Sequence, residues 1–424
     1  MTLGVKAPEA GFAARVRAIR SPGGIDAWLL EDHTLPILSL RFGFRGGPTL
    51  DPPDRAGTAR LLADLLGEGA GPFDGPAFRR ALGEKGIRLF FDVTGDDLRG
   101  EMLMLEKDID HAFALLGIAL NAPRLSSDDL TRLGRAAASE ARAELNRPDL
   151  VAARNLAAHG FGPHPYGRPA RGRPDDLERI SVADLAALRA RALTRGNLRV
   201  ALVGAIGPEA AGRALDRAFA DLPHAAPESI PETVLTGLGT RLVTRLDLPQ
   251  AAIRFARPGI PRRDPDFLAA IVAVHCLGGG TFSARLFTEL RERRGLCYAA
   301  WATLQVAQGA CTLVGATSVR NDRVAEAIGV IETEILRLRE GLGRDELTRA
   351  KGYLTGSYVL RFDSSSAIAH RLLELQFDGR DIAWLDERNR RIAAVTEADI
   401  RRAVARLVGA GDLLVAVAGN PTEL

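Results

Sequence analysis

Cysteine is scarce in this sequence. There are three in 424 residues, Cys276, Cys297 and Cys311, and no two of them form a C-x-x-C pair. An odd and sparse set argues against a disulfide framework and against a structural zinc cluster. Because all three lie in apolar surroundings, we expect them to be buried packing residues.

Long apolar runs and blocks of like charge are also missing. The longest apolar stretch, 267–277, contains His275 and is shorter than the roughly 18 residues of a membrane helix. The beginning of the chain lacks the apolar core of a secretory leader. The 56 basic and 53 acidic residues are spread along the chain, which does not indicate a nucleic-acid partner. We therefore expect a soluble protein without a membrane span, cytoplasmic unless a leader was removed for a periplasmic location.

Paired histidines, the usual mark of a catalytic zinc helix, are absent as well. The chain has seven histidines, and no two of them are three or four residues apart. Histidines at i and i+4 share one helix face and can bind the same zinc ion. The sequence therefore predicts no metal site in this chain.

What the sequence does contain is enough apolar residues for more than one core. It is 46% hydrophobic and 26% charged, as in globular proteins. A chain of 424 residues is too long for one ordinary core, so two or more domains are expected.

The second half of the chain repeats the first. Asp184 and Asp399 each lie in the first turn of a predicted helix, at an offset of 215 in the numbering. Gly204 and Gly419 each end the apolar run that follows such a helix, and their offset is the same. This agreement indicates an internal duplication.

Further matches extend the repeat toward the beginning of each half. The sequence DDLTR at 128–132 recurs as DELTR at 345–349, at an offset of 217. Each half also opens with two predicted strands, at 27–30 and 37–44 in the first half and at 240–246 and 251–256 in the second. Strands and helices are mixed without regular alternation, which predicts an α+β fold.

A linker separates the two halves. Residues 222–239 contain three prolines and no apolar periodicity. We therefore expect a first domain at 1–221, a linker at 222–239 and a homologous second domain at 240–424.

Several local sequences resemble the M16 family of zinc peptidases, of the type with two domains per chain (M16B) that includes the mitochondrial processing peptidase. The resemblance covers nearly the whole chain. It rests on FGFRGG at 42–47, GTARLLADLLG at 57–67, HPYG at 164–167, LGGG at 277–280 and SARLFTELRERRGLCY at 283–298. It implies a clamshell of two homologous α+β domains.

In the M16 family the helix after the second strand carries H-x-x-E-H, which supplies two zinc ligands and the general base. Here the matching positions are Arg60, Ala63 and Asp64. A permanent cation at Arg60 would repel Zn²⁺, and Ala63 cannot accept a proton. Glu140 lies at the family's distance for a third ligand, either as a remnant of that ligand or as a solvated acid on a helix surface. The resemblance thus implies that this half has lost its zinc site.

The second half retains another family feature, an arginine and a tyrosine seven residues apart. The matching residues are Arg291 and Tyr298, and Gly295 between them suits the end of a helix before a strand. In the family such a pair donates hydrogen bonds to the substrate carbonyl and to the oxyanion. We therefore expect Arg291 and Tyr298 to position substrate, and Arg285 in the same run to be structural.

The glycine segment Gly278, Gly279 and Gly280 allows three interpretations. Exposed backbone amides could cradle a phosphate, although no G-K-[ST] follows. The segment also resembles the glycine-rich loop of the mitochondrial processing peptidase α-subunit, which contacts substrate, and it could be a plain turn. We regard these glycines as candidate substrate-binding residues and expect HPYG at 164–167 to be a structural turn.

The resemblance implies a division of labour between two chains. This chain would be the non-catalytic, substrate-positioning subunit of a heteromeric peptidase and would hold no cofactor. A partner with an intact H-x-x-E-H motif would supply Zn²⁺ and the general base, and the substrates would be peptides. Two alternatives remain: a structural subunit like the core subunits of the respiratory bc1 complex, or a stand-alone peptide-binding homodimer.

Overall fold

The structure, a computed structural model, describes residues 11–280 and 282–423. Its contacts divide the chain into two compact units. Unit 1 comprises the residues up to Ala141, Pro169–Ile230 and Tyr358–Glu387, and unit 2 comprises Arg142–Arg168, Pro231–Ser357 and the residues from Arg388 onward. One crossing between the units, at Ile230 and Pro231, falls inside the predicted linker. Both units are discontinuous, whereas the sequence predicts the continuous domains 1–221 and 240–424.

Unit 1 is built on a six-stranded sheet in the order β1-β2-β8-β3-β7-β6. Only β2 and β8 run parallel, and the other neighbours are antiparallel. The strands are β1 (Val16–Arg20), β2 (Asp26–Glu31), β3 (Ile37–Arg45), β6 (Arg88–Val93), β7 (Asp97–Leu105) and β8 (Leu198–Gly204). A separate small hairpin joins β4 (Gly69–Ala70) to β5 (Phe73–Asp74).

Helices of the first half surround this sheet. They are α1 (Thr58–Leu66), α2 (Gly75–Gly83), α3 (Ile109–Asn121), α4 (Ser127–Glu144), α6 (Pro174–Arg179), α7 (Val182–Ala192) and α8 (Pro208–Phe219). The predicted helix that begins near Asp184 is α7, which ends at Ala192 before the chain turns into β8. Apolar faces of these helices and of the sheet form one core, in which Phe42 and Phe219 pack edge to face.

Unit 2 is built on a five-stranded sheet in the order β11-β12-β10-β13-β9. The strands are β9 (Arg241–Arg245), β10 (Gln250–Pro258), β11 (Cys297–Val306), β12 (Cys311–Arg320) and β13 (Leu414–Gly419). Helices of the second half in this unit are α9 (Phe267–Val274), α10 (Arg285–Phe287), α11 (Val324–Arg337), α12 (Arg344–Gly356), α15 (Glu397–Gly409) and the later part of α14 (Trp384–Ala394). Two short π-helical segments follow α9 and α10, at His275–Gly279 and Thr288–Arg293.

The two sheets have the same topology once β1 is set aside. The order β2-β8-β3-β7-β6 in unit 1 corresponds to β9-β13-β10-β12-β11 in unit 2. The one parallel pair is also equivalent, β2 with β8 and β9 with β13. The expected α+β fold of two homologous halves is therefore confirmed.

Helix caps and terminal glycines show the repeat at the level of single residues. Asp184 in α7 and Asp399 in α15 each complete a capping box at the beginning of the helix. Gly204 and Gly419, at the ends of β8 and β13, have φ of 137° and 157°. A Cβ at Gly204 would lie 2.2 Å from the carbonyl oxygen of Ile37, so only glycine allows this close strand approach.

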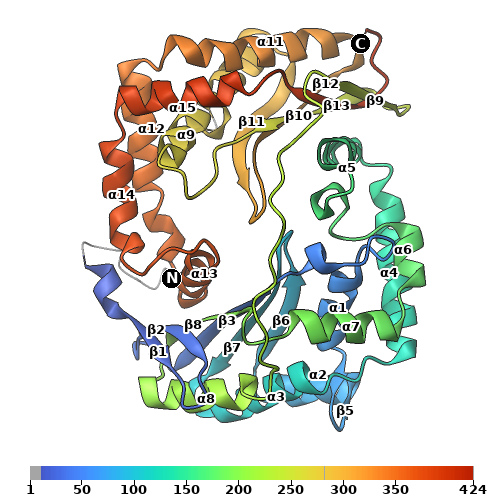
Figure 1. The fold of residues 1–424 in the computed structure, drawn as a ribbon, viewed down its shortest axis with the longest axis vertical. Helices are drawn as coiled ribbons and strands as arrows, with labels where there is room; N and C mark the ends of the chain where they lie inside the picture. Colours follow the sequence, from blue (N-terminus) through green and yellow to red (C-terminus); the bar gives the residue numbers. More distant parts are fainter. Residues whose placement is uncertain (1–10, 281, 424) are drawn as a thin grey trace. The chain divides into compact units, whose positions relative to one another are not determined.

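One pair of equivalent helices is exchanged between the units. α5 (Pro148–Phe161) and α13 (Ser365–Phe377) occupy matching positions of the repeat, because their first residues have the same offset as the DDLTR and DELTR segments. Nevertheless α13 packs on β3 and β8 of unit 1, and α5 packs on β10 and β13 of unit 2. Figure 1 shows the exchange by colour, because red-brown α13 lies beside the early strands and teal α5 beside the late ones. This exchange is why the units are discontinuous.

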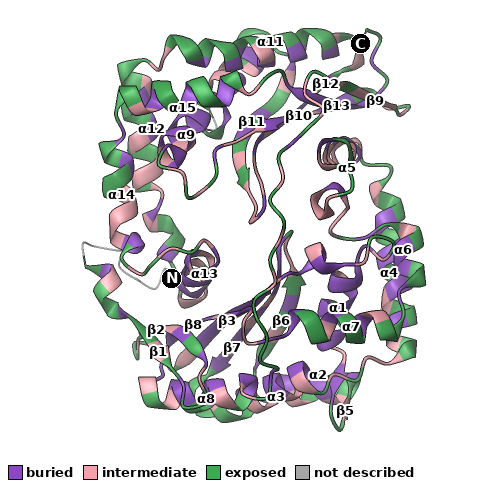
Figure 2. Ribbon diagram, viewed as in Figure 1, coloured by how far each residue is buried: buried purple, intermediate pink, exposed green. Residues whose placement is uncertain are grey.

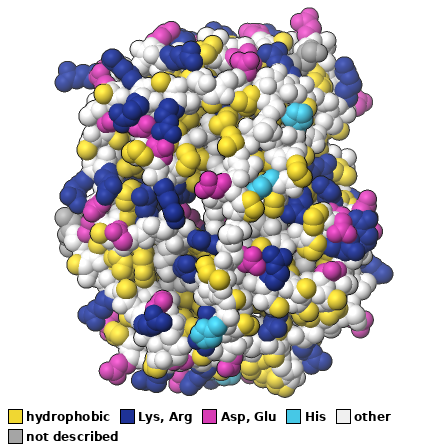
Figure 3. All heavy atoms as spheres, viewed as in Figure 1, with side chains coloured by type: hydrophobic (Ala, Val, Ile, Leu, Met, Phe, Trp, Pro, Cys, Tyr) yellow, Lys and Arg dark blue, Asp and Glu magenta, His cyan; other side chains and the backbone are white. Residues whose placement is uncertain are grey.

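The buried residues follow this architecture. In Figure 2 the central strands of each sheet are mostly buried, whereas helices such as α8 and α11 alternate between buried and exposed residues. On the face shown in Figure 3, basic and acidic side chains are interspersed with apolar ones. Within the described ranges 11–280 and 282–423, no helix combines the length and apolarity needed to cross a membrane.

Candidate functional site

The residues that the sequence matched to H-x-x-E-H form, in unit 1, a cluster of charges centred on an arginine. α1 carries Arg60, Ala63 and Asp64, as the sequence predicts. Arg60 Nε lies 3.8 Å from Asp64 Oδ2 one helical turn away, and Arg60 Nη2 forms an ion pair with Glu140 Oε2 on α4. The Arg60 side chain is 14% exposed, so its cation is largely enclosed by these groups.

These residues do not fit a zinc ion. The Arg60 guanidinium already supplies the positive charge that faces both carboxylates, and it cannot be deprotonated in a protein. Burial raises the pKa of Asp64, and the nearby charge of Arg60 opposes that rise. In the part of the chain that the structure describes, no group of three His, Cys, Asp or Glu side chains is arranged to hold a metal. The Glu140 side chain is 60% exposed on the surface of α4, and its carboxylate pairs with Arg60.

Arg291 and Tyr298 are brought together in unit 2. Arg291 lies in the π-helical segment after α10, and Tyr298 lies at the beginning of β11. Gly295 between them has φ of 61°, as expected for a helix end. The Cζ atom of Arg291 is 4.6 Å from the centre of the Tyr298 ring and 5.2 Å from that of Phe287. The guanidinium therefore packs against both aromatic rings.

Neighbouring arginines in the same run are neutralised, and Arg291 is not. Arg293 and Arg294 both pair with Glu289. Arg285 forms a two-point ion pair with Glu346, with both N–O distances 2.8 Å, as its expected structural role requires. Among the described residues, no carboxylate forms an ion pair with Arg291, so its hydrogen-bond donors are available to a ligand.

A β-bulge directs Tyr298 outward. Cys297 on β11 pairs with Val319 on β12, and the next pair is Ala300 with Thr317. The chain thus advances three residues along β11 but only two along β12, which leaves one extra residue on β11. The extra residue bends the strand and changes the direction of its side chains. Tyr298 is 82% exposed as a result. Thr317 Oγ1 donates a hydrogen bond to the carbonyl oxygen of Ala299 at 2.9 Å and so holds the bulge from the neighbouring strand.

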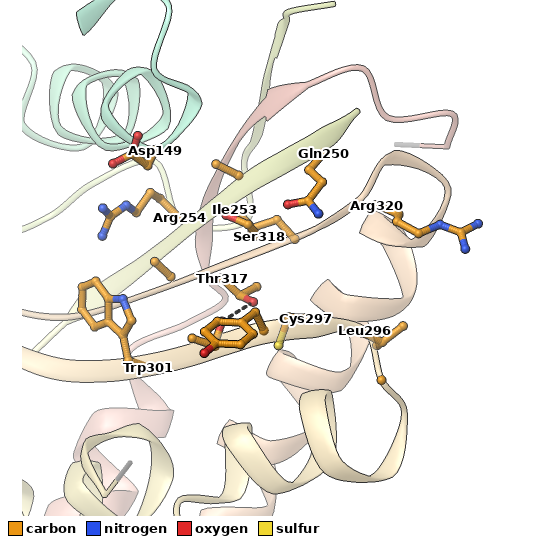
Figure 4. Close-up of a pocket in the computed structure, with 15 residues that line it drawn as sticks. Asp149, Gln250, Ile253, Arg254, Leu296, Cys297, Trp301, Thr317, Ser318 and Arg320 are labelled. Atoms are coloured by element: carbon orange, nitrogen blue, oxygen red, sulfur yellow. Dashed lines mark hydrogen bonds between the residues drawn. The ribbon is translucent and has the colours of Figure 1, made fainter. Parts of the chain in front are cut away.

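Tyr298 borders a pocket of about 580 Å³ on the open part of the unit 2 sheet. Figure 4 shows residues of α5, β10, β11 and β12 around it, with Arg254 lying between Asp149 and Trp301. The Cζ atom of Arg254 is 5.2 Å from the centre of the Trp301 ring system. Sequence reasoning missed Arg254 and Trp301. The one available signal was that Arg254-Phe255 on β10 repeats Arg41-Phe42 on β3.

The glycine segment is the end of a π-helix packed on β11. A Cβ at Gly278 would lie 2.2 Å from the backbone nitrogen of Ala302, so this glycine permits close packing. The amide of Gly280 already donates to the carbonyl oxygen of His275 at 3.0 Å, which removes one donor from a phosphate cradle. Gly279 is exposed, and Gly280 borders a second pocket of about 300 Å³. A role in substrate binding stays a prediction for these glycines.

The remaining expectations concern the turn at 164–167 and the cysteines. His164 caps a short 3₁₀ turn, and its Nε2 lies 3.0 Å from the carbonyl oxygen of Pro231, as a structural turn requires. All three cysteines are free thiols; Cys276 is buried, and Cys297 and Cys311 are half-buried. Burial raises the pKa of the Cys276 and Cys311 thiols to about 12, so both are protonated at neutral pH.

Comparisons with known proteins agree with this architecture. Residues 179–354 match the family model described as the peptidase M16 inactive domain. The chain is 24% identical over 339 residues to the non-peptidase homolog YmxG of Helicobacter pylori, covering 80% of this chain and 78% of that protein. It is 28% identical over 416 residues to an uncharacterized zinc protease of Streptomyces coelicolor, covering 92% of this chain and 86% of that protein.

Solved structures share the fold. A peptidase M16 inactive domain from Pseudomonas fluorescens matches with a TM-score of 0.89 at 23% identity, covering 96% of this chain and 98% of that one. A protease from Helicobacter pylori matches with a TM-score of 0.86 at 16% identity, covering 98% and 100%. The M16 resemblance is thus supported for the inactive domain at 179–354, and the relatives are named as a non-peptidase homolog and a zinc protease.

Proposed function

We propose that this chain is the substrate-positioning, non-catalytic subunit of a two-chain M16 peptidase. The observation that carries the proposal is the contrast between two sites. In unit 1, Arg60 places a fixed cation at the position matched to a zinc ligand. In unit 2, Arg291 packs against the ring of Tyr298, and among the described residues no carboxylate forms an ion pair with Arg291. The inactive-domain match and the non-peptidase relative support a non-catalytic member of this group.

The chemistry assigned to this chain is hydrogen-bond donation. A guanidinium and a phenol can both donate to the carbonyl oxygen of a peptide bond, and donation strengthens as negative charge develops on that oxygen. The rings of Phe287 and Tyr298 restrict the motion of Arg291 before substrate arrives, so less entropy is lost on binding. A partner with H-x-x-E-H would supply Zn²⁺ and the general base.

Extended peptides suit the edge next to this pair. β11 is an edge strand of the unit 2 sheet, and Tyr298 lies at its beginning. An edge strand can pair its free backbone groups with a peptide in extended conformation, which gives affinity without strict sequence demand.

The test is reconstitution of peptide cleavage with a candidate H-x-x-E-H partner. We expect no cleavage by this chain alone, cleavage by the mixture, and a loss of about tenfold to a thousandfold in kcat for Arg291→Ala and Tyr298→Phe. Arg293→Ala is the matched control, because that arginine is exposed and paired with Glu289. Undiminished activity of both pair variants would exclude the positioning role.

A purely structural or binding role is the second candidate, and the name of the Helicobacter pylori relative favours it. It predicts a stable complex in which no peptide is cleaved, whether or not Arg291 and Tyr298 are present. A self-associating peptide binder would instead give a homodimer when its mass is measured without any partner.

A further inference from the structure

Arg41 in unit 1 has a carboxylate partner and a hydroxyl partner. It lies in the middle of β3, where it forms an ion pair with Glu101, its direct neighbour on β7. Its Nη2 also donates to Ser366 Oγ on α13 at 2.9 Å. The terminal nitrogens of a guanidinium enclosed between a strand and a helix are thereby paired with a carboxylate and a hydroxyl, while its buried Nε has no hydrogen-bond partner.

Arg254 is the equivalent residue of unit 2, and its carboxylate partner is missing. It occupies the middle of β10 and is followed by phenylalanine, like Arg41. Its direct neighbour on β12 is Ala316, at the place that Glu101 takes in unit 1. Among the described residues, no carboxylate forms an ion pair with Arg254.

The nearest acid does not replace that partner. Asp149 is the second residue of α5, as Ser366 is of α13, so it takes the place of Ser366 in the repeat. Its charge acts on Arg254, yet Asp149 Oδ2 lies 3.1 Å from Arg147 Nη2 and is shared with that cation. Arg320, which also lines the pocket, pairs with Asp322. The pocket therefore carries a net positive charge at Arg254.

The surroundings of Arg254 suit an incoming anion. The side chain is half-buried, and Ala316 on β12 is the direct neighbour of both Arg254 and Trp301. Figure 4 shows the Arg254 side chain close to the Trp301 ring. Burial lowers the pKa of Arg254, and the charge of Asp149 opposes that shift. A charge-assisted hydrogen bond is stronger in such a partly desolvated place than at an open surface. The volume of about 580 Å³ lies within the range of ligand pockets.

We propose that the pocket binds a carboxylate on Arg254, packed against Trp301, so that the ligand supplies the group that Glu101 supplies in unit 1. Tyr298 borders the same pocket, so the carboxylate would belong to the peptide whose backbone that tyrosine positions. The assignment to a peptide rests on the proposed function, and the assignment to a carboxylate rests on Arg254 and Ala316. The carboxylate comes from an acidic side chain or from a free C-terminus.

Ala316 provides a direct test, because a substitution there can introduce a carboxylate at the position that Glu101 occupies in unit 1. In the whole chain, the new carboxylate of Ala316→Glu would form an ion pair with Arg254 and so compete with the ligand. Ala316→Gln is the matched neutral control. Arg254→Gln removes the cation. Binding of fluorescent peptides is measured by anisotropy, with Glu or Gln inside the peptide and with a free or amidated C-terminus.

We expect Arg254→Gln and Ala316→Glu each to weaken binding of the carboxylate peptide about tenfold to a hundredfold, and Ala316→Gln to leave it within about threefold. Preference for Glu over Gln identifies a side-chain source, and preference for the free over the amidated end identifies a C-terminal source. Equal binding of all four peptides, or unchanged affinity in both Arg254→Gln and Ala316→Glu, overturns the proposal.

Separate measurements test the carboxylate site at Arg254 and the positioning role of Arg291 and Tyr298, so one proposal can fail without the other. Arg291→Ala should lower kcat in the reconstituted complex about tenfold to a thousandfold and keep the preference for carboxylate peptides. If no partner restores cleavage while the Arg254-dependent preference persists, the proposed function fails and the carboxylate site stands. Matching melting temperatures of Ala316→Glu and Ala316→Gln would show that the loss of binding is not a loss of folding.

Discussion

At the scale of single residues, the partners of each arginine separate structural from candidate functional cations. Arg60 and Arg285 are held by carboxylates, whereas Arg291 and Arg254 pack against aromatic rings, and Arg254 also lines a pocket. Arg291 became a candidate from the sequence through the resemblance of residues 283–298 to the M16 family. The sequence could not predict Arg254, because the missing partner is only visible once β10 and β12 are paired in register.

The cluster around Arg60 should contribute to stability. Arg60→Gln leaves Asp64 and Glu140 facing each other without the intervening cation. Since Glu140 is 60% exposed, solvent screens much of this repulsion, and we expect a loss of about 1 kcal/mol in the free energy of unfolding. Urea denaturation measures it. The double variant with Glu140→Gln should recover part of the loss, and strictly additive losses would mean that the two residues do not interact.

Asp97 should make stability depend on pH. It is 3% exposed, and burial raises its pKa from 3.8 to about 6, against the opposing charge of Arg99. The folded chain therefore holds this proton more tightly than the unfolded chain does. The contribution of Asp97 to the free energy of unfolding should fall by about 2 kcal/mol as pH rises from about 4 to about 7.

Asp97→Asn removes the titrating group and is the comparison variant. Urea unfolding of both proteins across this pH range should show the wild-type curve declining relative to the variant. Parallel curves would mean that Asp97 titrates near its ordinary value in the folded chain.

At the scale of secondary structure, local patterns predicted the strands that open each half and the helices at Asp184 and Asp399, and they missed elements fixed by tertiary contacts. The paired strands and the capped helices α7 and α15 follow from local pattern and cap chemistry. The π-helical segments and the bulge at Tyr298 do not follow from local sequence pattern. Each depends on how a segment packs on a neighbour, as Gly278 does on Ala302. Both irregularities lie beside the candidate site, where such features are common.

Two glycine substitutions should change stability in opposite directions. Gly278→Ala places a Cβ 2.2 Å from the Ala302 backbone and should lower the free energy of unfolding by about 1–3 kcal/mol through overpacking. Gly329→Ala, inside α11 with no atom within 4 Å of the new Cβ, should raise it by about 0.5–1 kcal/mol. Thermal or urea unfolding distinguishes them, and equal shifts would contradict the close packing of the π-helix on β11.

At the scale of the whole molecule, the sequence predicted the duplication and the fold class but not the helix exchange. The offset between DDLTR and DELTR also relates α5 to α13 and identifies them as equivalent helices. Which sheet each one covers depends on long-range packing, and both have apolar faces that would suit either sheet. The boundaries 1–221 and 240–424 therefore describe the repeat, while the packed units cross them.

The exchange predicts that the first repeat cannot fold alone. A fragment of residues 1–221 lacks α13 and would expose the face of β3 and β8 that buried residues such as Leu372 and Leu373 cover. We expect it to aggregate or bind a hydrophobic dye, and co-expression with residues 222–424 to yield a folded complex. Gel filtration and circular dichroism test this. A monomeric fragment with a cooperative melt would contradict the prediction.

Helix exchange also sets the order in which the nascent chain can mature on the ribosome. The last strand of the unit 1 sheet ends at Gly204, but its covering helix is not complete until Phe377. At about 5–20 residues per second, translation of the intervening segment takes about 10–35 s. During that interval an apolar sheet surface is exposed with its own helix still unsynthesised. The early chain should therefore be a client of ribosome-associated chaperones, and synonymous codons that slow the second half should lower the yield of folded protein.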